Sequence, residues 1–248
     1  MTSQIEKSLT QSQLNDLNQS RNRTQSTVGV IATSYPLKIT FVGDSSVGKT
    51  SLITKYCEEK FSPEGSNPTI SVGIFEKSIK IDSFTEAKLS IWDTAGSEKY
   101  LSFTKSYLRE SNGIILVFDF TNEKSFKNLD LWMDLIDESV RPEKLEKILV
   151  GNKSDLPDRK VNEEVAKKYA GEHGMKFVSV SAKDGINIDF LFEVVANNCV
   201  KKLQEDKNEI LENNNNNNNK DNNEEKINML SVENNNKNDK KKQKRKCC

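Results

Sequence analysis

Residues 37–56 read LKITFVGDSSVGKTSLITKY: an apolar run, a loop rich in glycine and serine, and a second apolar run with helical spacing. The loop matches G-x-x-x-x-G-K-[ST] and stands between a predicted strand and a predicted helix, the context that gives this pattern its meaning. Gly43 and Gly48 allow tight turns, so that N–H groups at the helix start can surround phosphate oxygens. Lys49 is placed to reach the β- and γ-phosphates, and the Thr50 hydroxyl to ligate Mg²⁺. The stretch predicts a nucleoside triphosphate site but leaves the base undecided.

Around this loop, runs that read as strands alternate with segments of helical spacing. The predicted strands are LKITFVG, VGIFEKSIKI, AKLSIWDT, GIILVFDFT, KILVGNK and KFVSVSAK. The predicted helices include SFKNLDLWMDLIDES, EEVAKKYAGEH and INIDFLFEVVANNCVKKLQED. The alternation predicts an α/β domain with a mostly parallel sheet, whose ligands lie beyond the carboxyl ends of the strands. The second and third strands are predicted to form an antiparallel hairpin at one edge.

Both ends of the chain differ in composition from its centre. The N-terminal part is rich in Ser, Thr, Gln and Asn, and the C-terminal part contains seven consecutive asparagines at 213–219. Such segments bury too little apolar surface to offset an ordering cost of roughly 1–2 kcal/mol per residue. We therefore predict a disordered N-terminal extension at 1–35, a folded domain at 36–205, a disordered Asn-rich linker at 206–239 and a polybasic tail at 240–248.

The composition of the 248 residues limits the class of protein. Basic and acidic residues balance at 37 each, but the positive charge gathers in the last ten residues, DKKKQKRKCC. This indicates a basic tail rather than a nucleic-acid-binding body, so no nucleic acid is expected as a partner. Four cysteines in a chain of this length are no disulfide framework. The first twenty residues lack an apolar core, and the longest apolar run, IILVF, is far too short to span a membrane.

Two further motifs indicate which base is bound. NKSD (152–155) follows one predicted strand and SAK (181–183) follows another. A carboxylate at Asp155 can accept both the exocyclic amine and the ring N–H of guanine, whereas adenine would leave it unpaired. A P-loop nucleoside kinase would share GDSSVGKT, but that reading gives no reason for NKSD, SAK or the two terminal cysteines.

With these motifs the chain resembles the Rab family of small Ras-superfamily GTPases over about residues 36–205. KLSIWDTAG, LVFDFT, SAK and the final CC carry the resemblance. It implies a P-loop G domain, a six-stranded mostly parallel sheet with one antiparallel edge strand, and five helices. It also implies a monomeric GTP hydrolase that switches between GTP and GDP and recruits effectors to intracellular membranes in vesicle trafficking. A largely non-hydrolysing, GTP-bound membrane scaffold is the alternative.

The resemblance also implies roles for residues around the phosphates and the base. Phe61 would stack on guanine, Thr69 would ligate Mg²⁺ when a γ-phosphate is present, and Asp93 would hold Mg²⁺ through water. Asn152 and Asp155 would fix the base. The metal ligands are thus Thr50, Thr69 and Asp93, and the predicted nucleotide-binding residues are Gly43, Asp44, Ser45, Ser46, Val47, Gly48, Lys49, Thr50, Ser51, Phe61, Thr69, Asp93, Gly96 (whose N–H would sense the γ-phosphate), Asn152, Lys153 (packing along the base), Asp155, Ser181, Ala182 (whose N–H would donate to the guanine carbonyl) and Lys183.

Ser97 follows DTAG, where the family has a glutamine that orients the hydrolytic water. The serine hydroxyl is shorter, so we predict slow intrinsic hydrolysis in a catalytic set of Ser97, Lys49 and Thr69. An activating protein that supplies the missing group is the other interpretation. Trp132 is predicted to be a core residue.

The terminal Cys247 and Cys248 imply geranylgeranylation, and the basic residues before them would add attraction to an anionic leaflet. Without the cysteines, a basic run of this kind would be read as a nuclear-localisation signal or a solvated tail. The resemblance further implies an exchange factor, a GTPase-activating protein, a prenylation escort and a GDP-dissociation inhibitor as partners. The predicted location is the cytoplasmic face of an intracellular membrane, with a cytosolic pool.

Overall fold

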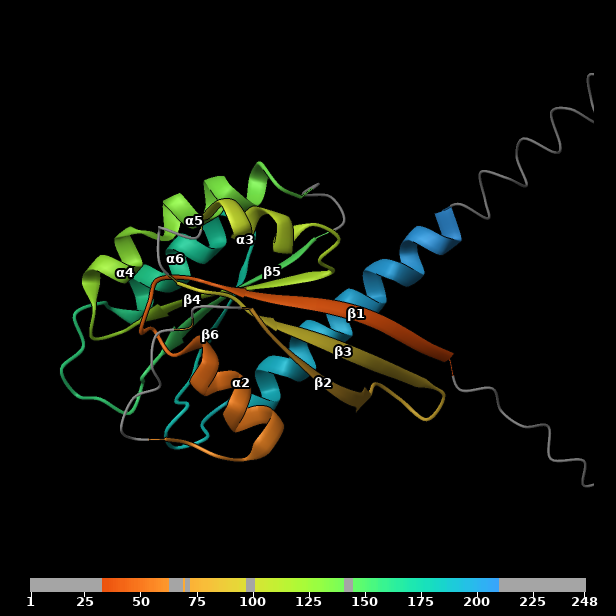
Figure 1. Ribbon diagram of the computed structural model, residues 1–248, viewed down its shortest axis with the longest axis horizontal. Coiled ribbons are helices and arrows are strands. Elements are labelled where there is room, and N and C mark those ends of the chain that lie inside the picture. The colour runs from red at the N-terminus through yellow and green to blue at the C-terminus, as the bar shows by residue number, and fades with distance from the viewer. Residues whose placement is uncertain (1–32, 63–68, 70–71, 97–100, 141–144, 210–248) are drawn as a thin grey trace, which may run out of the picture.

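One six-stranded sheet forms the centre of the molecule (Figure 1). The computed structural model describes residues 33–62, 69, 72–96, 101–140 and 145–209, with the backbone alone at 101–103. The strand order is β2-β3-β1-β4-β5-β6; β2 is antiparallel to its neighbour β3, and the other neighbouring strands pair parallel. The strands are β1 (Thr33–Val42), β2 (Gly73–Lys80), β3 (Thr85–Asp93), β4 (Gly113–Asp119), β5 (Glu146–Asn152) and β6 (Lys176–Ser179). The predicted mostly parallel sheet with one antiparallel edge strand is confirmed.

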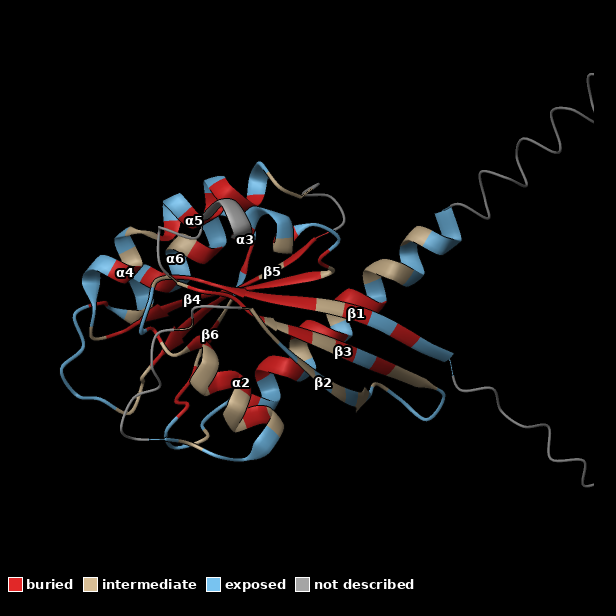
Figure 2. Ribbon diagram, viewed as in Figure 1, coloured by how far each residue is buried: buried red, intermediate tan, exposed pale blue. Residues whose placement is uncertain are grey.

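Helices cover both faces of the sheet (Figure 1). They are α2 (Lys49–Glu58), α3 (Leu101–Leu108), α4 (Glu123–Lys127), α5 (Leu129–Asp137), α6 (Glu163–Glu172) and a C-terminal helix at 188–209. One buried apolar cluster lies under α2 and the C-terminal helix, and a second lies under α3, α5 and α6. Figure 2 shows the buried residues gathered along the strands, and β4 is buried at every position. Within the described ranges, every helix falls short of the length and apolarity that a membrane span requires.

The predicted helix SFKNLDLWMDLIDES is interrupted in the structure. Asn128 ends α4 and begins α5, with φ −79° and ψ −3°. If α4 and α5 are taken as one interrupted helix, the described residues form the five helices that were predicted. The apolar spacing continues through Asn128, so the sequence pattern gave no sign of the break.

Two predicted boundaries of the folded domain are corrected by the structure. β1 begins at Thr33, opposite Thr85 of β3, so residues 33–35 belong to the sheet and not to an extension. Pro36 is tolerated there because β1 pairs with β4 only from Ile39 onward, which leaves that side of the strand without a partner.

At the other end, the C-terminal helix continues to residue 209, beyond the predicted boundary at 205. The two segments beyond the predicted boundaries contact each other, since the Lys207 Nζ lies 4.6 Å from the centre of the Tyr35 ring. The rest of the predicted extension, linker and tail lies outside the described residues.

Glu110 follows α3 in the left-handed region, at φ +61°, and is exposed. We expect Glu110→Gly to raise the free energy of unfolding by about 1 kcal/mol, because glycine adopts this backbone conformation without a Cβ clash. Urea denaturation measures the change. The same substitution at exposed Glu193, inside the C-terminal helix, should lower the free energy of unfolding by about 1 kcal/mol. A Glu110→Gly protein no more stable than the wild type contradicts the strain argument.

Candidate nucleotide-binding site

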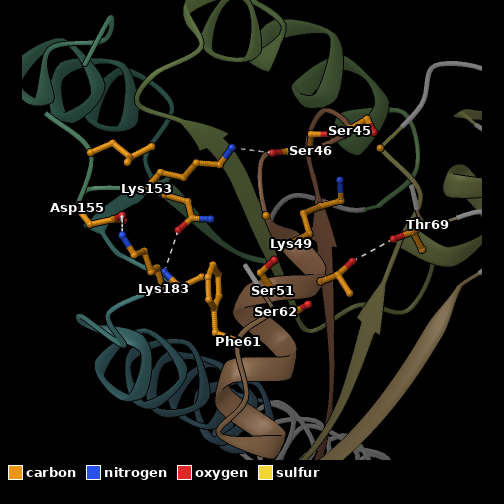
Figure 3. Close-up of a pocket in the computed structure, with 16 residues that line it drawn as sticks. Ser45, Ser46, Lys49, Ser51, Phe61, Ser62, Thr69, Lys153, Asp155 and Lys183 are labelled. Atoms are coloured by element: carbon orange, nitrogen blue, oxygen red, sulfur yellow. Dashed lines mark hydrogen bonds and ion pairs between the residues drawn. The ribbon is translucent and has the colours of Figure 1, made fainter. Parts of the chain in front are cut away.

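A cavity of about 340 Å³ opens beyond the carboxyl ends of the parallel strands, where the α/β topology predicts a ligand (Figure 3). Its lining comes from five separate parts of the sequence: 45–51, 61–62 with Thr69, Gly96, 152–156 and 182–183. The lining residues are Ser45, Ser46, Gly48, Lys49, Thr50, Ser51, Phe61, Ser62, Thr69, Gly96, Asn152, Lys153, Asp155, Leu156, Ala182 and Lys183. The structure therefore brings GDSSVGKTS, NKSD and SAK together around one space.

The loop between β1 and α2 wraps around the side chain of Lys49. The Lys49 Nζ donates to the backbone oxygens of Gly43 at 2.7 Å and Asp44 at 2.9 Å, which holds the ammonium group inside the turn. Only 6% of this residue is exposed. Burial lowers the pKa of Lys49 to about 8, against the opposing charges of nearby carboxylates. An anion in the cavity would restore the solvation that the ammonium group has lost.

Both loop glycines are required by their surroundings. Gly43 has φ +135° and Gly48 has φ +95°, values that L side chains rarely adopt. A Cβ at Gly43 would meet the backbone oxygen of Val117, and one at Gly48 would meet the Asn152 amide. The loop is therefore packed tightly against β4 and against the start of NKSD.

Gly96 approaches the loop from the end of β3. A Cβ built there would lie 2.5 Å from the Lys49 Nζ and 2.5 Å from the Asp44 backbone oxygen. Only glycine allows this approach, which places the Gly96 backbone beside the ammonium group.

Three oxygen-bearing side chains meet next to Lys49. The Thr50 hydroxyl donates to Asp93 Oδ2 at 2.6 Å, and the hydroxyls of Thr50 and Thr69 lie 3.0 Å apart. Asp93 Oδ1 is buried and has no hydrogen-bond partner within the described residues. Burial raises the pKa of Asp93, although the Thr50 bond and the Lys49 charge oppose this. A buried carboxylate oxygen without a partner beside two hydroxyls is a donor set of the kind that Mg²⁺ prefers, so these residues fit that ion.

Asn152 ties the two halves of the cavity together. Its Nδ2 donates to the backbone oxygen of Val47 at 2.8 Å, and its Oδ1 accepts the Ala182 N–H at 3.2 Å. The Lys153 Nζ donates to the backbone oxygen of Ser46 at 3.0 Å and pairs with Asp119 at 2.6 Å. The phosphate-binding loop, β5 and the SAK segment are thus fixed to one another.

Asp155 lies at the far side of the cavity from Thr69 (Figure 3). Its Oδ1 accepts the Ser181 hydroxyl at 2.7 Å, and its Oδ2 lies 3.9 Å from the Lys183 Nζ. With 8% of its side chain exposed, this carboxylate has few water partners left. It is oriented for a ligand that offers N–H donors.

Several predicted residues support the cavity without lining it. Gly43 and Val47 belong to the loop, and the Gly43 backbone oxygen accepts from Lys49. The buried Ser181 hydroxyl donates to Asp155, and Asp93 accepts from Thr50. The Asp44 carboxylate points out of the cavity and is bound by Asn128 and Trp132.

Ser62 and Leu156 line the cavity although the sequence reading did not include them. Each directly follows a predicted site residue, Phe61 or Asp155, and this position next to a site residue is the one feature of the sequence that could have indicated them. Ser97, Cys247 and Cys248 lie outside the described residues.

Comparisons with known proteins agree with this geometry. The sequence model of the Ras family matches residues 38–201. Ras-related protein Rab-8B of Bos taurus is 38% identical over 176 residues, which cover 71% of this chain and 84% of that protein. Ras-related protein Rab-13 of Bos taurus is 40% identical over 172 residues, covering 69% and 83%. Ras-related protein Rab-8 of Diplobatis ommata is 37% identical over 176 residues, covering 71% and 82%. The chain therefore belongs to the Ras family and, within it, to the Rab small GTPases.

Proposed function

We propose that this protein is a molecular switch that binds GTP or GDP with Mg²⁺ and, with GTP bound, recruits effectors to an intracellular membrane in vesicle transport. The observation that carries the proposal is one cavity lined by both the Lys49 ammonium group and the Asp155 carboxylate (Figure 3). The Lys49 ammonium group suits a triphosphate and the Asp155 carboxylate suits a guanine base, so a single guanine nucleotide would pair with both groups. Membership of the Rab family supports the membrane part of the proposal.

At the phosphate end, Lys49 would exchange its two carbonyl partners for contacts with β- and γ-phosphate oxygens. Thr50, Thr69 and Asp93 would hold Mg²⁺, Asp93 through water. When bound, this ion neutralises charge on the phosphate oxygens. Because the Thr69 hydroxyl lies only 3.0 Å from that of Thr50, Thr69 would ligate the ion when a γ-phosphate is present and would lose this contact when the γ-phosphate is lost.

At the base end, the Asp155 carboxylate would accept the exocyclic amine and the ring N–H of guanine. The half-buried ring of Phe61 would stack on the base, and the stem of Lys153 would pack along it. The Ala182 N–H, whose bond to Asn152 is long at 3.2 Å, would be shared with the guanine carbonyl.

Hydrolysis is proposed to be slow because Ser97 replaces the glutamine that would orient the attacking water. Positioning and charge stabilisation account for nearly all catalysis of this reaction, so a displaced water lowers the rate and leaves binding unchanged. A partner protein can supply the missing group. In the alternative, a GTP-bound scaffold, turnover would remain negligible even with such a partner.

The C-terminal tail is proposed to anchor the protein. Two prenyl groups on Cys247 and Cys248 would give stable membrane attachment where one gives only reversible binding. An exchange factor, a GTPase-activating protein, a prenylation escort and a GDP-dissociation inhibitor would then control the cycle between membrane and cytosol.

We expect Asp155→Asn to weaken GDP binding by about 10⁴-fold, because the new amide group presents donors to the donors of guanine. Isothermal titration of nucleotide-free protein with GDP measures this loss. Asp158→Asn makes the same change at an exposed residue outside the cavity and should bind GDP normally. Unchanged affinity in Asp155→Asn would mean that another group recognises the base.

Replacing Ser97 with glutamine should accelerate single-turnover GTP hydrolysis by at least about tenfold, because the longer side chain reaches the attacking water. The affinity for GTP serves as the control and should not change. If the rate stays at the wild-type value, the short side chain is not what limits hydrolysis.

The double substitution Cys247→Ser and Cys248→Ser should move the protein from the membrane fraction to the cytosol, since both lipid attachment sites are lost. Cell fractionation followed by immunoblotting measures the distribution. Cys57→Ser, at a half-buried position in α2, should leave it unchanged. Continued membrane association of the double variant would rule out the lipid anchor.

A further inference from the structure

Asp44 belongs to the phosphate-binding loop, yet its side chain turns away from the cavity. Its Oδ2 accepts a hydrogen bond from Asn128 Nδ2 at 2.7 Å, and its Oδ1 accepts one from Trp132 Nε1 at 2.8 Å. The donors lie 84 and 88 residues farther along the chain, at the junction of α4 and α5. Both carboxylate oxygens are therefore occupied by neutral N–H donors from one short segment.

The break between α4 and α5 makes the first of these bonds possible. Asn128 is the N-cap residue of α5, but its side chain makes no capping hydrogen bond and is free to reach Asp44. The start of α5 also places the positive end of its helix dipole near this carboxylate.

The second donor is held rigidly by the core. Trp132 is 3% exposed and packs in the cluster under α5 with Leu129 and Ile136. Its indole N–H has no other partner among the bonds of the described residues. The donors thus belong to the scaffold, whereas Asp44 belongs to the loop that must accept and release a ligand.

The backbone of Asp44 is close to the group on which phosphate binding depends. Its carbonyl oxygen accepts from the Lys49 Nζ at 2.9 Å. A carboxylate released from α4 and α5 could rotate toward that ammonium group. It would then compete with phosphate for Lys49 and repel the phosphate charge.

We propose that Asn128 and Trp132 are positioning residues that hold the Asp44 carboxylate away from Lys49 and thereby slow the release of nucleotide. We call this arrangement of Asp44, Asn128 and Trp132 the Asp44 latch. The inference rests on the proposed function, because it concerns the lifetime of a bound guanine nucleotide. It assigns to the α4–α5 junction a role in the exchange step that the residues lining the cavity do not reveal.

The direct test is Asn128→Asp in the full-length chain, which preserves shape but sets a second carboxylate against Asp44. We expect fluorescent GDP to dissociate about tenfold faster, since like charges at this separation push the Asp44 carboxylate out of its place. Asn162→Asp is the matched control, because Asn162 is likewise the N-cap of a helix and lies outside the cavity. Its dissociation rate should equal that of the wild type.

A reciprocal exchange separates positioning from a general loss of structure. In Asp44→Asn combined with Asn128→Asp, the introduced amide can donate to the introduced carboxylate, and the indole N–H of Trp132 can still donate to the amide oxygen. This double variant should recover slow release. If each substitution only damaged the structure, their effects on the rate of GDP release would instead add, and the double variant would release GDP faster than either single variant.

Trp132→Phe supplies a second variant that keeps an aromatic ring and removes only the indole donor and part of its volume. It should speed release in the wild-type background and have no further effect when Asp44 is replaced by alanine. The latch is overturned if Trp132→Phe speeds GDP release equally with and without the Asp44 carboxylate, or if Asn128→Asp leaves the release rate unchanged. Neither result would contradict the proposal that the protein binds guanine nucleotides. A wild-type chain that binds no labelled GDP instead overturns the proposed function itself.

Discussion

The ammonium group of Lys49 is the constraint around which the site is built. It is buried at the centre of a loop in which two backbone oxygens accept its hydrogen bonds, and burial lowers its pKa to about 8 even though the charges of Asp93 and Asp44 oppose the shift. A buried cation is stabilised by a neighbouring anion, and a triphosphate in the cavity would supply one. β1 delivers the loop, α2 begins at Lys49 itself, and Gly96 reaches the same group from β3. The phosphate end of the cavity is therefore a consequence of how β1, β3 and α2 pack.

The base end depends on the loop through a small number of long-range bonds. Asn152 and Lys153 follow β5 and donate to the backbone oxygens of Val47 and Ser46. These bonds fix the distance between Lys49 and Asp155, so that one ligand must fit both ends. The Asp44 contacts to α4 and α5 add a third attachment of the same loop to the scaffold. Binding and release of nucleotide would then involve all three attachments.

Sequence reasoning recovered the sheet and nearly all of the cavity lining because both are encoded locally. Gly48 and Lys49 are recognisable from the pattern GDSSVGKTS, and in the structure Gly48 has a φ of +95°. β4 is recognisable as a strand because its residues before Asp119 are apolar, and in the structure all of its positions are buried. The errors arose where long-range contacts decide the outcome. Thr33–Tyr35 join the sheet by pairing with β3, and the C-terminal helix reaches 209, where Lys207 meets the Tyr35 ring. Likewise, the residue type of Asp44 gives no hint that its carboxylate turns to a helix more than 80 residues away.

We infer that one cavity binds both a phosphate chain and a guanine base. The most direct measurement is the identity of the nucleotide released by denaturing the purified full-length chain after it has been prepared with Mg²⁺, determined by chromatography. We expect GDP or GTP, in an amount close to one per protein chain. Adenine nucleotides in the same proportion, or no nucleotide together with equal affinities for ADP and GDP, would contradict it.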